Sequence, residues 1–176
     1  MAFCSGCDIS ENKTIDPITQ QDSIVSSMVN SDTIRPALST PEIIEIKTTR
    51  IDSVVNFAET LIGTPYKYAS TDPGEGFDCS GFITYTFNHF NIAVPRSSVD
   101  FTNVGQPIDL PLAKRGDLIL FTGTDSTIRV VGHMGIVTQN SDTLKFIHST
   151  SGKQYGVTIT SLNNYYMSRF VKVIRY

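Results

Sequence analysis

The sequence predicts an α+β fold in which an antiparallel sheet carries helices packed on one side. Two observations lead to this prediction. A helical pattern of apolar residues opens the part of the chain that can build a core, and five short apolar segments of strand length then follow one another. Clusters of Gly, Ser, Asn, Thr and Asp mark turns between several of these segments.

The composition fits one ordinary globular domain. The chain has 176 residues, of which 40% are apolar and 18% charged, and this length allows one full hydrophobic core. A net charge of −3 and a pI near 5.5 give no basic footprint for nucleic acid. No apolar run approaches the roughly 18 residues that a membrane span needs. We therefore expect no nucleic-acid partner and no membrane-embedded segment.

The first 45 residues differ in composition from the rest. Apart from Phe3, every aromatic residue lies at Phe57 or beyond, and residues 8–41 are rich in Ser, Thr, Asp, Asn and Gln and contain no Gly. This stretch has too few large apolar side chains for a core of its own. We expect residues 1–45 to form a polar tether or strap and residues 46–176 to form the folded domain.

Two of the three cysteines, Cys4 and Cys7, form a lone C-x-x-C. Without a second ligand pair or a βαβ pattern, a zinc or redox site there has little support. Ser5-Gly6-Cys7 also resembles the end of a bacterial lipoprotein signal, but the charged and apolar regions that precede such a cysteine are absent. Two interpretations stay open: the sequence begins within such a signal and carries an N-terminal lipid anchor, or the similarity is accidental.

The folded part is expected to open with a helix. Asp52 is a suitable N-cap, and Gly63 followed by Pro65 is a typical C-terminal stop. Apolar residues recur at helical spacing between these positions, at Val54, Val55, Ala58, Leu61 and Ile62.

The segment after Cys79 is ambiguous on propensity alone. A glycine-bearing loop, residues 72–76, precedes it, and residues 82–87 consist largely of strand formers. Its apolar residues also fall along a helical stripe, for which Asp78 would be the cap. Both assignments stay open on these residues alone.

The second half of the chain is expected to form strands. The segments are apolar and bounded by glycine and polar turn residues. They cover residues 117–121, 128–137, 144–148, 157–160 and 170–174.

Two histidines, His133 and His148, lie on consecutive expected strands joined by a short turn. If the hairpin centres on Ser141-Asp142, His148 faces Gly135, which leaves room for its ring, and His133 faces Thr150. Both rings then project from one face as diagonal neighbours within about 8 Å. A turn one residue longer or shorter would break this parity. A single histidine on a sheet is more often structural than catalytic, so the pair needs a reactive partner.

Cys79 is the candidate partner. A cysteine flanked by Phe77 and Phe82 is usually a small buried apolar group. A place in the first turn of a helix would instead expose it to the positive end of the helix dipole, which favours the reactive thiolate. A nearby imidazole would lower the pKa further from its free value of about 8.5.

Six motifs occur in order over residues 51–176. They are Gly63-Thr64-Pro65-Tyr66, Phe77-Asp78-Cys79-Ser80-Gly81-Phe82, Val94-Pro95-Arg96-Ser97-Ser98, Gly116-Asp117-Leu118-Ile119-Leu120-Phe121, Gly132-His133-Met134-Gly135-Ile136-Val137 and Phe146-Ile147-His148-Ser149. In order and approximate spacing they closely resemble the NlpC/P60 family of cell-wall cysteine peptidases. The resemblance favours the helical assignment of the segment after Cys79.

The resemblance implies a papain-like fold with Cys79 at a helix N-terminus, packed against the sheet that bears the histidines. By position, Cys79 matches the nucleophile, His133 the general base and His148 the third polar residue, which holds the tautomer of His133. The implied reaction, without cofactor or metal, is hydrolysis of an amide in peptidoglycan stem peptides, typically between D-glutamate and a diamino acid. It runs through an acyl-enzyme, with the Cys79 N–H as an oxyanion donor.

The resemblance also implies a substrate site and a location. Tyr66 matches a tyrosine of the cleft, and Asp78 and Ser80 match residues that some members use on a substrate amine. The expected partner is peptidoglycan or a muropeptide, and the expected location is the bacterial cell envelope, periplasmic or lipid-anchored. Tyr68-Ala69-Ser70 and the long loop at residues 123–130 depart from the family pattern and leave the substrate preference open.

Three other interpretations remain open. The same catalytic set would also serve a papain-like amidase or acyltransferase that acts on another small amide or on a lipid. The chain would be an inactive binding module if it had lost activity, although no catalytic position is substituted. Cys79, His133 and His148 would form a zinc site if a fourth ligand, which is not evident, were present.

Overall fold

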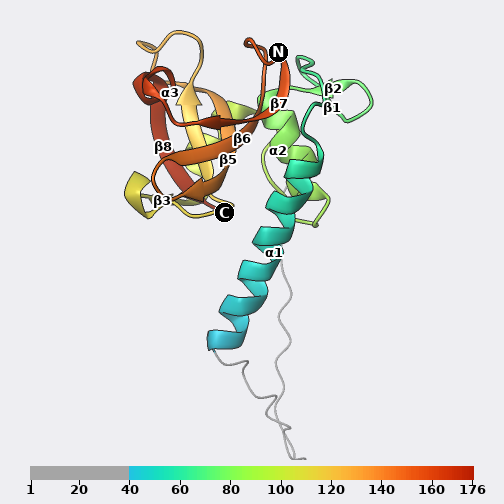
Figure 1. Ribbon diagram of the computed structural model, residues 1–176, viewed down its shortest axis with the longest axis vertical. Coiled ribbons are helices and arrows are strands. Elements are labelled where there is room, and N and C mark those ends of the chain that lie inside the picture. Colours follow the sequence, from blue (N-terminus) through green and yellow to red (C-terminus); the bar gives the residue numbers. More distant parts are fainter. Residues whose placement is uncertain (1–39) are drawn as a thin grey trace, which may run out of the picture. The chain divides into compact units, whose positions relative to one another are not determined.

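The computed structural model describes residues 40–176 (Figure 1). In this range the helices are α1 (Thr40–Thr60), α2 (Cys79–Asn88) and α3 (Asn164–Arg169), with two short 3-10 helices, η1 (Ser98–Asn103) and η2 (Leu110–Leu112). The strands are β1 (Thr71–Asp72), β2 (Gly76–Phe77), β3 (Gln106–Ile108), β4 (Leu118–Thr122), β5 (Val131–Asn140), β6 (Leu144–Thr150), β7 (Gly156–Ser161) and β8 (Phe170–Arg175). No helix among these residues is both long and apolar enough to cross a membrane.

Six strands form one antiparallel sheet in the order β3-β8-β4-β5-β6-β7, and β1 pairs with β2 in a separate hairpin. The five predicted strands are present as β4 to β8, with ends that differ by at most three residues from the predicted ones. The prediction of an α+β fold with an antiparallel sheet is confirmed. Strand β3 was not predicted because it has three residues and a mostly exposed sequence.

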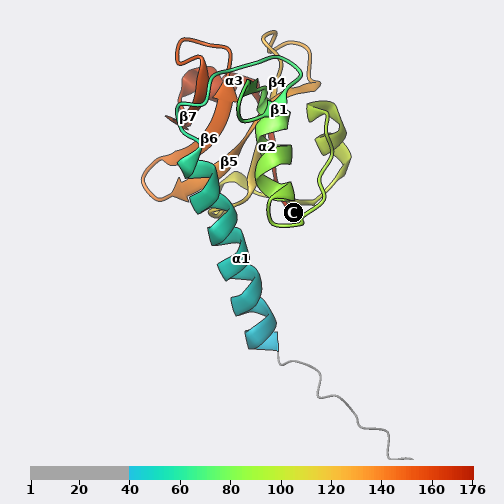
Figure 2. The same cartoon turned by 90° about the vertical axis from the view of Figure 1, so that its right-hand side faces the viewer.

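The large sheet is covered on both faces. Along β4, Leu118 and Leu120 pack into a core cluster with residues of α1 and α2, whereas Ile119 and Phe121 pack into a second cluster that contains Tyr166 of α3. Figure 1 shows α2 and α3 on opposite sides of the sheet, and Figure 2 shows α1 and α2 together in front of it. The prediction of helices on one side holds for α1 and α2. The short α3, which was not predicted, lies on the other side.

Helix α1 begins at Thr40, and the predicted start at Asp52 is wrong. Thr40-Pro41 is itself a helix-start signal, because a proline in the first turn lacks only an N–H that has no helical partner there. Three of the five predicted apolar positions are confirmed, since Val54, Val55 and Ala58 are fully buried, whereas Leu61 and Ile62 follow the last residue of the helix and Ile62 is 51% exposed.

The predicted boundary between residues 45 and 46 falls inside α1. The other predictions for the N-terminal segment concern the polar tether, the Cys4 and Cys7 pair and the lipoprotein-like signal. All of these lie outside the described residues, apart from the first residues of α1.

Strands β5 and β6 pair in two registers separated by a β-bulge. Near the turn, Asn140 pairs with Leu144, whereas beyond the bulge at Thr138, Ile136 pairs with Ile147. The register beyond the bulge is the one predicted from a turn centred on Ser141-Asp142. A straight continuation of the register near the turn would place the two histidines on opposite faces, because a shift of one residue reverses the face.

Candidate active site

Cys79 is the first residue of α2, and Asp78 is its N-cap, as predicted. The Asp78 backbone is extended, with φ −80° and ψ 176°, and its carboxylate accepts the Gly81 N–H. Glycine is required at position 81 because a Cβ there would lie 2.0 Å from the Ser70 carbonyl oxygen. The segment that propensity left ambiguous is therefore helical, and its cap holds the sulfur at the helix N-terminus.

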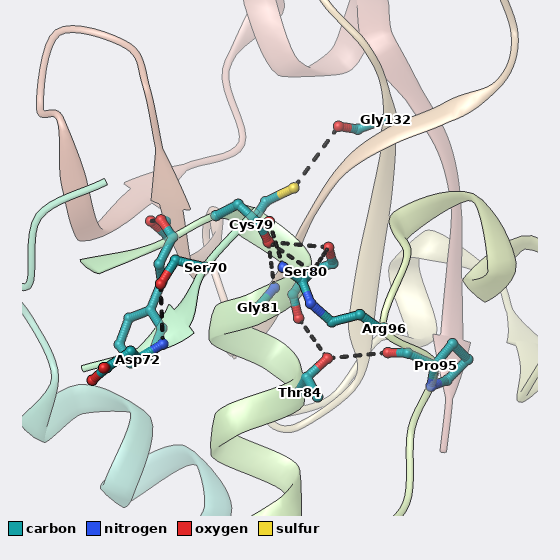
Figure 3. Close-up of polar contacts among 12 residues, drawn as sticks. Ser70, Asp72, Cys79, Ser80, Gly81, Thr84, Pro95, Arg96 and Gly132 are labelled. Atoms are coloured by element: carbon teal, nitrogen blue, oxygen red, sulfur yellow. Dashed lines mark hydrogen bonds and ion pairs between the residues drawn. The ribbon is translucent and has the colours of Figure 1, made fainter. Parts of the chain in front are cut away.

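The Cys79 sulfur is half-buried and faces β5 (Figure 3). It lies 3.8 Å from the carbonyl oxygen of Gly132, at the length of a weak S–H···O hydrogen bond. Gly132 immediately precedes His133. The contact therefore brings the candidate nucleophile to the strand that carries the candidate base.

The resting thiol is protonated at neutral pH. Burial raises the pKa of Cys79 to about 11, and the charge of Asp78 adds to the rise. Backbone hydrogen bonds from Ser80, Cys79 and Met134 oppose it without outweighing it. The prediction of a lowered pKa is therefore wrong for the resting protein, because the helix end lies in a site shielded from water and next to a carboxylate.

His133 and His148 are hydrogen bonded to each other on one face of the sheet. His133 Nε2 lies 2.8 Å from His148 Nδ1. A Cβ at Gly135 would lie 2.7 Å from the Phe146 ring, 2.8 Å from the Ile147 carbonyl oxygen and 3.1 Å from the His148 Cβ, so the glycine leaves room for Phe146 and for the neighbouring backbone. The hydrogen bond between the two rings shows that the predicted shared face is present.

Thr160 of β7 extends this pair into a chain of three residues. His148 is fully buried, and its Nε2 lies 2.9 Å from the Thr160 Oγ1. When His148 donates from Nε2 to Thr160, its Nδ1 accepts the Nε2–H of His133. Sequence reasoning missed Thr160, although its place in a predicted strand beside that of His148 was an available signal.

Both histidines are neutral at neutral pH. Burial, followed by His148 and then Arg169, lowers the pKa of His133 well below 6.5. Burial, followed by Arg169, lowers the pKa of His148 to about 4. Because Nε2 of His133 is engaged by His148, Nδ1 is the ring nitrogen left to accept a proton.

Two cavities meet at Cys79. The larger, of about 700 Å³, is also lined by His133, Thr160 and Arg169. The smaller, of about 470 Å³, is lined by Asp78, Ser80 and Arg96. Tyr66 lines both cavities, and burial raises the pKa of its hydroxyl, so that it remains a hydrogen-bond donor at neutral pH. The sulfur therefore lies where an extended substrate could occupy both sides.

The predicted substrate residues Asp78 and Ser80 are already joined to Arg96. Arg96 Nη2 donates to Asp78 Oδ2 at 2.8 Å and Nη1 to Oδ1 at 3.1 Å, and Nη1 also lies 3.0 Å from the Ser80 Oγ. Figure 3 shows Arg96 reaching this cluster from the segment after α2. The Asp78 charge therefore has a counter-ion before any substrate amine arrives. Arg96 belongs to one of the six motifs, but the sequence alone predicts no role for it.

Residues 50–176, whose side chains the structure describes, contain no group of three or more His, Cys, Asp or Glu side chains arranged to hold a metal ion. Both ring nitrogens of His148 are also hydrogen bonded to protein side chains, those of His133 and Thr160. The zinc interpretation of Cys79, His133 and His148 therefore has no support in the described part of the chain.

Comparison with known proteins gives one consistent family. Residues 63–175 match the model of the NlpC/P60 family. The chain is 31% identical over 136 residues to the gamma-DL-glutamyl hydrolase of Bacillus subtilis, covering 77% of this chain and 32% of the relative. It is 36% identical over 127 residues to the probable peptidoglycan endopeptidase LytE of the same organism, covering 72% and 34%. The chain thus spans about a third of the length of these relatives.

Solved structures agree with the fold. An NlpC/P60 family protein from Bacillus cereus superposes with a TM-score of 0.64 at 30% identity, over 72% of this chain and 40% of that protein. The NlpC/P60 domain of the peptidoglycan hydrolase SagA superposes with a TM-score of 0.59 at 24% identity, over 72% of this chain and 98% of that domain. The second likeness concerns the fold alone.

Proposed function

The chain belongs to the NlpC/P60 family, and from this premise we propose that it is a cysteine endopeptidase that hydrolyses amide bonds in peptidoglycan stem peptides at the bacterial cell envelope. The observation that carries the proposal is one cavity lined by both Cys79 and His133, with His148 hydrogen bonded behind His133. The names of the two Bacillus subtilis relatives, a gamma-DL-glutamyl hydrolase and a probable peptidoglycan endopeptidase, support the substrate class.

The proposed reaction starts from a neutral thiol and a neutral imidazole. As the Cys79 sulfur attacks the substrate carbonyl, its proton passes to Nδ1 of His133 and a carbon–sulfur bond forms. The carbonyl electron pair moves to oxygen, where the Cys79 N–H at the start of α2 stabilises the negative charge. Transfer at the moment of attack fits a thiol whose pKa is raised and a base whose pKa is lowered.

The tetrahedral intermediate then collapses. The carbon–nitrogen bond breaks, and His133 gives its proton to the leaving amine, which departs. Water attacks the thioester while His133 accepts a water proton. When the carbon–sulfur bond breaks, the acyl group leaves as a carboxylic acid and His133 returns its proton to the sulfur, which restores the thiol. His148 accepts the Nε2–H of His133 throughout, which leaves Nδ1 as the ring nitrogen that takes and returns the proton.

The finer proposal is cleavage between D-glutamate and a diamino acid, with Tyr66, Asp78 and Ser80 on the acyl side. All three line the smaller cavity, which His133 does not line. A substrate amine there would meet the Asp78 carboxylate together with Arg96, so it would add a cation to an existing ion pair. Tyr66 supplies a neutral hydroxyl beside the sulfur.

A panel of defined γ-D-glutamyl stem peptides, read by mass spectrometry of the products, tests the proposal. We expect one amide to be cut by the wild type, and Cys79→Ala to lower turnover by at least about 10³-fold. Cys4→Ala removes a thiol elsewhere and serves as the matched control. Circular dichroism checks that each variant is folded. Retained turnover in Cys79→Ala, or an acyl adduct from a different amide or lipid with no cleavage of any stem peptide, would reject it.

A further inference from the structure

Arg169 is a buried cation without an acidic partner in the described part of the chain. This last residue of α3 is only 7% exposed. Its Nη2 donates to the Thr122 carbonyl at 2.9 Å, its Nη1 donates to the Tyr165 hydroxyl at 2.5 Å, and its Nε is buried without any hydrogen-bond partner. No carboxylate among residues 50–176, whose side chains the structure describes, lies within ion-pair distance of it. A buried charge without a counter-ion destabilises the protein, so an anion bound nearby would be stabilised.

The cavity beside Arg169 has a one-sided charge. The charged residues that line this larger cavity are Arg169 and the exposed Lys153, and its lining contains neither Asp nor Glu. The smaller cavity differs, because it pairs Asp78 with Arg96. When the only charged residues that line a cavity are cations, the electrostatic potential inside it is positive and favours a negatively charged group.

The leaving part of the substrate belongs in this larger cavity. The departing nitrogen takes its proton from His133, so the leaving group must lie on the His133 side of the sulfur. His133 lines the larger cavity and not the smaller one. The group that reaches Arg169 is therefore attached to the leaving amine.

We infer that Arg169 recognises a carboxylate on the leaving diamino acid and is a specificity-determining residue of the enzyme. The inference rests on the proposed function. A guanidinium has five N–H groups in a planar fork that matches a carboxylate, and Thr122 and Tyr165 use only two of them. The substrate class is thus an amide whose leaving part carries a free carboxylate, in preference to the same compound with a carboxamide.

A matched pair of substrates tests this inference without any variant. One is a γ-D-glutamyl peptide that ends in lysine with a free carboxylate, and the other ends in lysine carboxamide. We expect the wild type to cleave the carboxylate form with a kcat/KM about 10- to 100-fold higher, the range for hydrogen bonds to a charged group. Equal kcat/KM for the two would overturn the inference and leave the proposed function standing. Cleavage of neither would instead count against the proposed function.

Variants separate recognition from a purely structural role. Arg169→Gln should lower kcat/KM for the carboxylate form by about 10- to 100-fold and collapse the ratio between the two substrates. Arg129→Gln is the control, because Arg129 contacts the Ser168 and Phe170 carbonyls on both sides of Arg169 but does not line the cavity. It should preserve the ratio. If the Arg169→Gln variant lowers kcat/KM equally for both substrates, the inference is overturned.

Discussion

His133 and His148 meet ring to ring, with 2.8 Å between Nε2 and Nδ1, across two strands whose turn alone would have set them on opposite faces. The β-bulge at Thr138 shifts the pairing by one residue and brings both rings to the same side. His148 then lies over Gly135, fully buried, and reaches Thr160 on the next strand. The arrangement of the proposed base thus depends on the register of three strands.

The charge states of Cys79 and His133 predict the pH dependence. The pKa of His133 is lowered, so its neutral, proton-accepting form persists into mildly acidic solution. The thiol pKa of about 11 keeps Cys79 protonated through neutral pH. We expect the measured kcat/KM to be constant from mildly acidic to neutral pH and to fall at lower pH, where His133 gains a proton.

The same pKa values predict slow alkylation of the resting thiol at neutral pH. The rate of iodoacetamide modification of Cys79, followed by peptide mass spectrometry, should rise steeply towards pH 11. Peptide mapping separates Cys79 from Cys4 and Cys7. Rapid modification at pH 7 would indicate a thiolate in the resting protein and contradict this prediction. Slow modification at pH 7 is therefore no sign of an inactive protein.

Replacing His148 should act through His133. His148→Ala removes the acceptor of the His133 Nε2–H, so the imidazole is free to adopt the wrong tautomer and orientation. We expect kcat to fall by about 10²- to 10⁴-fold while KM changes little. His89→Ala, which removes a histidine away from both cavities, is the control. A rise in KM with unchanged kcat would argue against a role in base catalysis.

Thr160 should be a positioning residue for His148. Thr160→Val keeps the shape but removes the oxygen that lies 2.9 Å from His148 Nε2. One hydrogen bond of about 1–1.5 kcal/mol predicts a kcat lower by about 10-fold, with Thr160→Ser restoring it. Thr143→Val, at an exposed position between β5 and β6, is the matched control. If kcat of the Thr160→Ser variant is as low as that of the Thr160→Val variant, Thr160 does not position His148 through its hydroxyl.

Gly135 should tolerate no side chain. A Cβ at this position would lie 2.8 Å from the Ile147 carbonyl oxygen, which is backbone and cannot move cheaply, and 3.1 Å from the His148 Cβ. Gly135→Ala should lower the free energy of unfolding by about 1–3 kcal/mol and also reduce kcat. Gly123→Ala, which would meet nothing within 4 Å, should leave stability nearly unchanged. Urea denaturation of both variants measures the difference.

Much of this fold could be predicted because its signals are local. Asp78 caps α2 through contacts within three residues, and the apolar runs that became β4 to β8 were readable segment by segment. Helix α3 was not predicted because six residues are too few to show helical periodicity. Packing of Tyr166 against the sheet stabilises it.

The sequence by itself determined the fold class, the family and the identity of the three candidate catalytic residues, because cap chemistry, strand composition and motif order are properties of short stretches. Only the tertiary structure decided that a bulge brings the two histidines to one face and that Thr160 completes their chain. It also decided that Arg169 has no acidic partner among the side chains that the structure describes. It also reversed the expected pKa of Cys79. Strand register and side-chain burial depend on contacts between residues that lie far apart in the chain. Cys79 and Gly132, for example, are separated by 53 positions.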